Sequence, residues 1–360
     1  MDILEFRELQ EKTLASFKTI SEDFYAIDYQ HPYCLDAILA KGARNTADLV
    51  IKVAKQQYIP KNLMGMKAEE FACSSFDCKN ENNQHVMGRN FDFKRAQGVA
   101  VWCHPKDGYS SLAFSDANFM LYGYKVRSLY HREKPFNMLL APFTCVDGIN
   151  EKGLAISVLE IKAKPTRQSR GKRPVTTSLA VRGVLDTCAT VDEAIKFFSS
   201  HDMRDSIGCN YHFHVIDREG SSVIIEYVNN DMRILFPEGG TDDGFAYQCL
   251  TNFFLSWDGD NKRAFGHGRY KKMSEKLAQK QGQLNGRECM ELLQEVSTNT
   301  RHKIFRWRVT TLWSAVYNTE TCEVELCTGL DYTKKYKLAV DKPGVIEDCY
   351  INQEVRNESL

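Results

Sequence analysis

The stretch from Phe71 to Phe93, FACSSFDCKNENNQHVMGRNFDF, contains the residue types that a cysteine nucleophile needs. Two apolar runs flank an Asn-rich turn, a pattern that predicts a β-hairpin. The first run carries Cys73, and the second carries Arg89 and Asp92. A nearby cation favours a thiolate, and a carboxylate can orient a proton acceptor. On these residues alone, an ordinary hairpin with a buried cysteine and a surface ion pair is the simpler interpretation.

The spacing of Arg89 and Asp92 sets a geometric condition. Residues three apart on a regular strand point to opposite faces of the sheet. Both side chains can therefore reach Cys73 only if a β-bulge or the end of the strand intervenes.

Composition excludes several classes of function. Lys plus Arg equals Asp plus Glu at 47 each, so no net field attracts nucleic acid or an anionic membrane. The basic segment 162–174 has no aromatic residues to stack on bases, so a solvated loop is the better interpretation. No apolar run approaches the roughly 20 residues of a membrane span. His212 and His214 share a strand face without a carboxylate or cysteine pattern beside them, so we expect no metal and no cofactor.

The two ends of the chain and its cysteines indicate a compartment. The N-terminus MDILEFRELQEK has early acidic residues and no apolar core, unlike a secretory signal. The C-terminal NESL is not a lipidation motif. Twelve cysteines in such a chain are typical of reduced thiols, so a cytoplasmic location is expected.

Hydrophobic periodicity predicts the order of elements. Residues 1–72 are predicted to be helical, with Asp2 as a helix N-cap and Pro60 as a stop. Strands are predicted from about 71 to 159, including FNMLLAPF at 136–143. Helices, strands, helices and strands follow, in that order. Such an α+β order suits stacked antiparallel sheets that are covered by helices.

Four motifs in order resemble the choloylglycine hydrolase family of N-terminal-nucleophile (Ntn) hydrolases. Its relatives include penicillin V acylase, acid ceramidase and N-acylethanolamine acid amidase. Cys73 is followed by a Gly-Arg-Asn-Phe-Asp hairpin strand at 88–92, and then by Asn-Glu-Lys-Gly-Leu at 150–154. Thr251–Asn252 and Gly268–Tyr270 complete the set. In this family a cysteine becomes the N-terminal residue by self-cleavage.

The resemblance implies a four-layer αββα sandwich of two antiparallel sheets, preceded by a helical N-terminal segment. It divides the chain into a propeptide or N-terminal segment, 1–72, and a catalytic domain, 73–360, with cleavage between Ala72 and Cys73. The propeptide either stays bound as a separate chain or is lost. Glu160 stands where bile salt hydrolases have an asparagine and acid ceramidase has a glutamate. Arg263 is an alternative to Arg269. The implied catalytic residues are Cys73, Arg89, Asp92, Glu160, Asn252 and Arg269.

Elementary chemistry agrees with these roles. The α-amine of an N-terminal cysteine has a pKa of roughly 8, close to that of a thiol, so the residue carries its own base. Asp92 would hold the ammonium, and Asn252 would donate to the oxyanion, supported by Arg269. By the resemblance, Glu160 would join the amine network and take part in precursor cleavage.

We therefore expect an enzyme that cleaves a linear amide with an apolar acyl group through an acyl-enzyme on Cys73. Its partner is then a small-molecule acyl amide, with a homo-oligomer left open. Three alternatives stay open: a penicillin acyltransferase-like enzyme, an unprocessed relative that acts as a binding protein, and a hydrolase with an internal Cys–His pair. His85 is the first histidine to consider for that pair.

Overall fold

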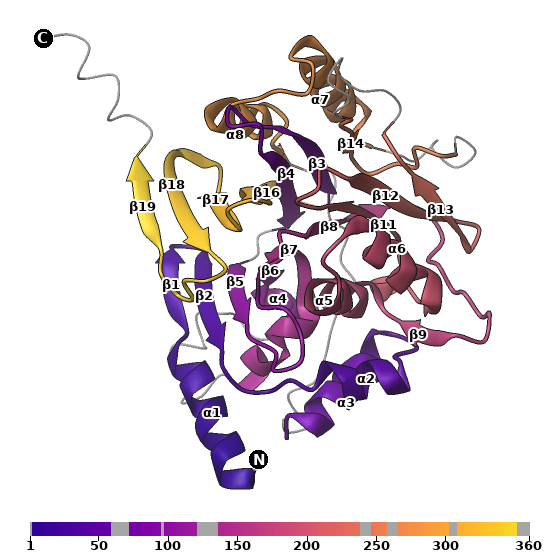
Figure 1. Cartoon of the computed structure of the whole chain (residues 1–360), viewed down its shortest axis with the longest axis vertical. Helices are drawn as coiled ribbons and strands as arrows, with labels where there is room; N and C mark the ends of the chain where they lie inside the picture. Colours follow the sequence, from indigo (N-terminus) through magenta and orange to yellow (C-terminus); the bar gives the residue numbers. More distant parts are fainter. Residues whose placement is uncertain are drawn as a thin grey trace, which may run out of the picture.

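Two large β-sheets stack face to face between two layers of helices (Figure 1). This confirms the expected αββα sandwich. The computed structural model describes residues 2–58, 72–94, 97–120, 136–237, 246–257, 265–301 and 308–350.

The first sheet has nine strands. All neighbours in it are antiparallel except β2 and β5, which are parallel, so the expectation of a wholly antiparallel sheet is wrong at this point. In spatial order the strands are β1 (Lys18–Ser21), β2 (Phe24–Tyr29), β5 (Gly98–Cys103), β6 (Ser111–Asp116), β7 (Cys145–Asn150), β8 (Ala155–Ile161), β11 (Asn210–Ile216), β12 (Ser222–Val228) and β13 (Asp231–Leu235).

The second sheet has eight strands and contains the predicted hairpin. Its two hairpin strands, β3 (Ala72–Lys79) and β4 (His85–Lys94), pair in regular antiparallel register. The other strands are β14 (Cys249–Leu250), β15 (Asn299–Arg301), β16 (Arg308–Asn318), β17 (Glu323–Thr328), β18 (Asp331–Ala339) and β19 (Glu347–Tyr350).

Helices cover the outer face of each sheet (Figure 1). Helices α5 (Thr177–Thr187) and α6 (Val191–Ser200) pack on the nine-stranded sheet, and α7 (His267–Gln279) and α8 (Gly286–Glu295) pack on the eight-stranded one. Shorter elements are α4 (Ala117–Met120), η4 (Ser206–Gly208), and β9 (Arg173–Val175) paired with β10 (His201–Met203). Among the described residues, no helix is long and apolar enough to cross a bilayer.

The core between the sheets is apolar and aromatic. Trp313 on β16 stacks on Phe91 of β4 with ring centroids 4.2 Å apart, and Phe24 of β2 meets the edge of the same indole. Close packing of this kind fixes the two sheets relative to one another. The face of the hairpin that carries Cys73 and Phe91 therefore lies against the other sheet.

The N-terminal segment contains the expected helices, namely α1 (Ile3–Ala15), α2 (Leu35–Lys41) and α3 (Thr46–Gln56). The Asp2 side chain caps α1 by accepting from Leu4 and Glu5, as predicted. The prediction of an entirely helical segment is wrong, however, because β1 and β2 occupy 18–29. Thr19, Ile20 and the buried aromatics of β2 favour a pleated, half-buried strand over a helix. Pro60 lies outside the described residues.

The predicted strand at 136–143 is also wrong. Phe136–Thr144 forms a 3-10 helix, η3, with Pro142 inside it. Proline lacks the backbone N–H that a strand in the middle of a sheet must donate.

Candidate active site

The Cys73 thiol lies in the interior of the sandwich. Cys73 pairs with Phe91 across the hairpin and Ser75 pairs with Arg89, so Cys73 and Arg89 share the face that points to the opposite sheet. The Cys73 side chain is fully buried. In this uncut chain the residue is an internal member of β3, with an amide nitrogen in place of an α-amine.

Arg89 lies next to the Cys73 sulfur, and its guanidinium group is fixed by hydrogen bonds to other residues. Its Nε donates to Asp147 at 3.1 Å, and one Nη donates to the Val158 carbonyl at 2.7 Å. Asp147 also accepts from Trp313 and Tyr317, so it is a fixed carboxylate. The remaining Nη of Arg89 has no hydrogen-bond partner among the described residues and is available to the sulfur.

Burial dominates the electrostatics of the thiol. Removal from water raises the pKa of Cys73 to about 11, although Arg89 and a hydrogen bond from the Asp92 main chain act to lower it. The uncut chain therefore holds a protonated thiol at neutral pH.

Asp92 lies on the opposite face of the hairpin, where it pairs with Ala72. Its carboxylate accepts from Arg269 at 2.5 Å, from Thr311 at 2.5 Å and from Thr298 at 3.2 Å. A bulge does occur here, but in the neighbouring strand, where the pairing skips a residue between Thr311 and Trp313. The Asp92 carboxylate therefore connects to Cys73 through other side chains.

That link runs through Arg269 and Asn252. The other Nη of Arg269 donates to Asn252 Oδ1 at 2.7 Å, and the main-chain N–H of Cys73 donates to the same oxygen at 2.9 Å. Because two donors meet this atom, it must be the oxygen of the amide. Asn252 Nδ2 donates to the Glu160 carbonyl at 2.8 Å, which leaves its second N–H for another acceptor.

Glu160 joins this cluster through its main chain. The residue is fully buried on β8, directly across from Tyr211 on β11. Burial and then the charge of Glu160 raise the pKa of the Tyr211 phenol well above its ordinary value. The structure thus brings all six sequence-predicted residues into one region. Arg263, the alternative to Arg269, lies outside the described residues.

Gly266 allows α7 to begin against the turn that carries Asn252. Its φ of +100° is in the left-handed region, and a Cβ there would lie 2.7 Å from the Thr251 hydroxyl and 3.3 Å from Arg269. Only glycine tolerates both conditions. Because the backbone at Gly266 lies so close to Thr251, helix α7 places the Arg269 side chain between Asn252 and Asp92.

The histidines serve other contacts. Both ring nitrogens of His85 are bonded, one to Asp77 at 2.9 Å and one to the Asp217 carbonyl at 3.0 Å, which argues against a Cys73–His85 pair. His214 bonds to Ser75 and Asp77, and His212 to Thr251 and Glu226. Within the described ranges, no group of three His, Cys, Asp or Glu side chains is arranged to hold a metal ion.

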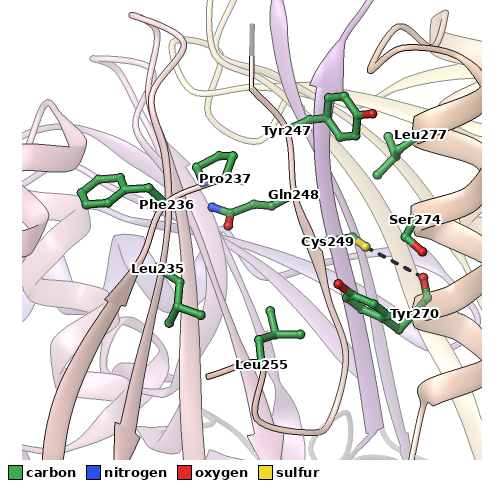
Figure 2. Close-up of a pocket in the computed structure, with 10 residues that line it drawn as sticks. All are labelled: Leu235, Phe236, Pro237, Tyr247, Gln248, Cys249, Leu255, Tyr270, Ser274 and Leu277. Carbon is green, nitrogen blue, oxygen red and sulfur yellow. Dashed lines mark hydrogen bonds between the residues drawn. The ribbon is translucent and has the colours of Figure 1, made fainter. Parts of the chain in front are cut away.

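A pocket of about 360 Å³ opens beside this region (Figure 2). It lies between the end of β13, strand β14 and helix α7, and none of the six candidates lines it. It borders the Asn252 turn through Leu255 and the Arg269 helix through Tyr270. Its lining is Leu235, Phe236, Pro237, Tyr247, Gln248, Cys249, Leu255, Tyr270, Ser274 and Leu277.

Sequence reasoning missed the residues that hold this cluster in place. Asp147 lies three residues before the Asn-Glu-Lys-Gly-Leu motif at 150–154, and this position was the available signal for it. Thr311 lies near none of the four motifs in sequence. Gly266, His212 and Glu226 gave no signal of their own, because their roles depend on contacts between distant segments.

Comparison with known proteins identifies the family of the chain. The sequence model described as acyl-coenzyme A:6-aminopenicillanic acid acyl-transferase matches residues 78–331, well over half of the chain. The match includes five of the six candidates and begins just after Cys73. Penicillin V acylase of Pectobacterium atrosepticum is 26% identical over 208 residues, which are 51% of this chain and 50% of that protein. The aligned part thus spans half the length of that relative.

Two solved structures share the fold. Both are variants of conjugated bile acid hydrolase from Clostridium perfringens. One has a TM-score of 0.51 at 13% identity and covers 78% of this chain and 97% of its own. The other has a TM-score of 0.50 at 14% identity, with coverages of 78% and 98%. At such identities the likeness shows the fold alone.

Proposed function

The chain belongs to the acyl-coenzyme A:6-aminopenicillanic acid acyl-transferase family, and from this premise we propose that it cleaves linear amides through a thioester on Cys73. One observation carries the proposal. The Cys73 N–H is held by Asn252 Oδ1, which Arg269 also contacts, while Arg89 lies beside the thiol. A structural cysteine needs none of these partners.

Self-cleavage between Ala72 and Cys73 would come first. The Cys73 thiol first loses its proton, its sulfur attacks the Ala72 carbonyl carbon, the C–N bond breaks, and the nitrogen that leaves takes up a proton. Water then hydrolyses the thioester, which yields a carboxylate on Ala72 and a free thiol and amine on Cys73. The amine forms at the position where Asn252 already accepts a hydrogen bond.

Turnover would repeat the same chemistry on an external amide. The new α-amine takes the thiol proton, and Arg89 stabilises the thiolate. The free N–H of Asn252 donates to the tetrahedral oxyanion, an interaction worth about 3 kcal/mol in comparable sites. Asn252 Oδ1 would accept from the ammonium, while Asp92 would act on it through Arg269 and the Glu160 carbonyl would hold the Asn252 amide in place.

The pocket of Figure 2 shares the Asn252 turn and helix α7 with the cluster, so it is the proposed site for the acyl group. Six of its ten described lining residues are leucine, phenylalanine or tyrosine, and polar atoms that could fix the orientation of a substrate form the larger part of its surface. Bile salts, penicillin V, N-acyl amino acids and fatty-acid amides are the substrates to compare. The description of the family also supports an acyl-transferase as the second candidate. An added amine that diverts product from acid to a new amide would identify that activity.

Mass spectrometry of the purified chain tests the proposal. We expect a fragment that begins at Cys73, and turnover of at least one acyl amide. Cys73→Ala should abolish both. The matched control is Cys78→Ala, because Cys78 is equally buried on the same strand but contacts Cys289 instead of the cluster. Turnover that survives in Cys73→Ala would refute the mechanism. A wild-type chain that stays intact and inactive would favour the unprocessed binding protein.

A further inference from the structure

The turn that carries Asn252 is tied to the opposite sheet by a buried pair of side chains. His212 on β11 and Glu226 on β12 lie across from one another, one step beyond the pairing of Phe213 with Ile225. The His212 Nδ1 lies 3.2 Å from Glu226 Oε1, and both side chains are fully buried.

Each member of the pair binds one end of the turn. His212 Nε2 donates to the Thr251 carbonyl at 2.7 Å, immediately before Asn252. Glu226 accepts from the main-chain N–H of Leu255 at 2.8 Å and of Ser256 at 3.1 Å, and from the Ser256 hydroxyl at 2.6 Å. Asn252 is therefore fixed from both sides by groups that do not touch Cys73.

Both ring nitrogens of His212 are used in these contacts. Nε2 faces the Thr251 carbonyl, and Nδ1 faces the Glu226 carboxyl group. Burial by itself would raise the pKa of Glu226, but hydrogen bonds with His212 and Ser256 hold it below its ordinary value. The pair is thus fully buried and polar, and such pairs are weak contributors to the stability of a fold.

We propose that His212 and Glu226 are positioning residues for Asn252, which keep its amide oxygen on the Cys73 nitrogen and its free N–H on the oxyanion. This inference rests on the function proposed above. Displacement of a catalytic group by about 1 Å can slow a reaction roughly a hundredfold. The pair would accordingly affect the rate of the chemical steps more than the affinity for substrate.

Two substitutions at His212 separate the two contacts. The amide nitrogen of His212→Gln can replace Nε2 and keep the bond to Thr251. The amide nitrogen of His212→Asn can replace Nδ1 and keep only the bond to Glu226. We expect self-cleavage and kcat to fall at least about tenfold in His212→Asn and less than about threefold in His212→Gln, with KM unchanged in both.

His85→Asn is the matched control. His85 forms a similar buried pair with Asp77 on the same hairpin, and its other ring nitrogen bonds to the Asp217 carbonyl, where His212 bonds to the 251–256 turn. Replacement of the His85 ring should lower the unfolding midpoint without changing kcat.

Equal rates in His212→Asn and His212→Gln, or an equal decrease of kcat in His85→Asn, would overturn the positioning role while the proposed function stands. A wild-type chain that neither cuts itself nor turns over would overturn both. If His212→Asn does not fold, Glu226→Gln takes its place, and wild-type kcat in that variant would also contradict the inference.

Discussion

Separation of the chain at residue 72 should leave its two parts bound together. Strand β2 is an interior strand, paired with β1 on one side and with β5 on the other, so removal of 1–72 would expose an edge of the sheet. The Tyr29 hydroxyl donates to the Leu139 carbonyl, and the Tyr33 hydroxyl donates to Asp186. We therefore expect residues 1–72 to remain as a noncovalent subunit.

The size of the effect follows from the buried side chains. Phe24, Ile27, Tyr29 and Tyr33 are each almost fully buried, and burial of each contributes about 1.5–3 kcal/mol. Burial of the four side chains together contributes about 6–12 kcal/mol before any costs of association. A micromolar dissociation constant corresponds to a binding free energy of about 8 kcal/mol. The ladder between β2 and β5 adds to this value, so the two parts should co-purify at micromolar concentrations.

The assay expresses 1–72 and 73–360 as separate chains, with an affinity tag on the first. We expect capture of both in equal amounts. Phe24→Asp should abolish capture, because it places a charge between Phe114 and Trp313. Glu22→Ala, in the exposed β1–β2 turn, is the control. A 73–360 chain that stays soluble and unattached to 1–72 without denaturant would refute this reasoning.

Three further predictions follow from the electrostatics. Because burial raises the pKa of Cys73 to about 11, self-cleavage through the thiolate should accelerate about tenfold per pH unit from pH 7 to 9; a flat profile would contradict this. Arg269→Gln should slow self-cleavage about a hundredfold, since it releases both Asn252 and Asp92, whereas the exposed Lys271→Gln should not. Burial raises the pKa of Asp205 to about 7, so the folded state binds a proton that the unfolded state has lost, and stability falls as pH rises from about 4 to 7. In urea unfolding, Asp205→Asn should remove this dependence of stability on pH. It should also raise the free energy of unfolding by up to about 4 kcal/mol at pH 8.

The hairpin and the order of motifs could be predicted because they depend on local patterns. The alternation around Cys73, the Asn-rich turn and Gly88–Asp92 specify two paired strands without knowledge of the rest of the chain. The αββα fold followed from the resemblance, and the structure confirms it. The N-terminal strands could not be predicted in this way, because Phe24 and Tyr29 become strand residues only when β5 and η3 pack against them.

The geometry of the site was harder to predict from the sequence than the hairpin. Regular alternation correctly separated Arg89 and Asp92 onto different faces of β4, but it could not reveal that Arg269 connects Asp92 to Asn252. The 3-10 helix at Phe136–Thr144 has the apolar composition of a strand, and only Pro142 argued against one. Contacts between segments far apart in sequence decide such cases, and the composition of one segment does not contain them.

The hydrogen bond between Cys73 and Asn252 joins residues 179 positions apart, and the ion pair between Asp92 and Arg269 joins residues 177 apart. If these contacts drive self-cleavage, the cut cannot precede synthesis of α7, which takes about 10–40 s after Cys73 is added at ordinary translation rates. Truncated or misfolded chains would stay in one piece. The cut would then act as a quality check, in which only a correctly completed fold acquires a reactive N-terminus.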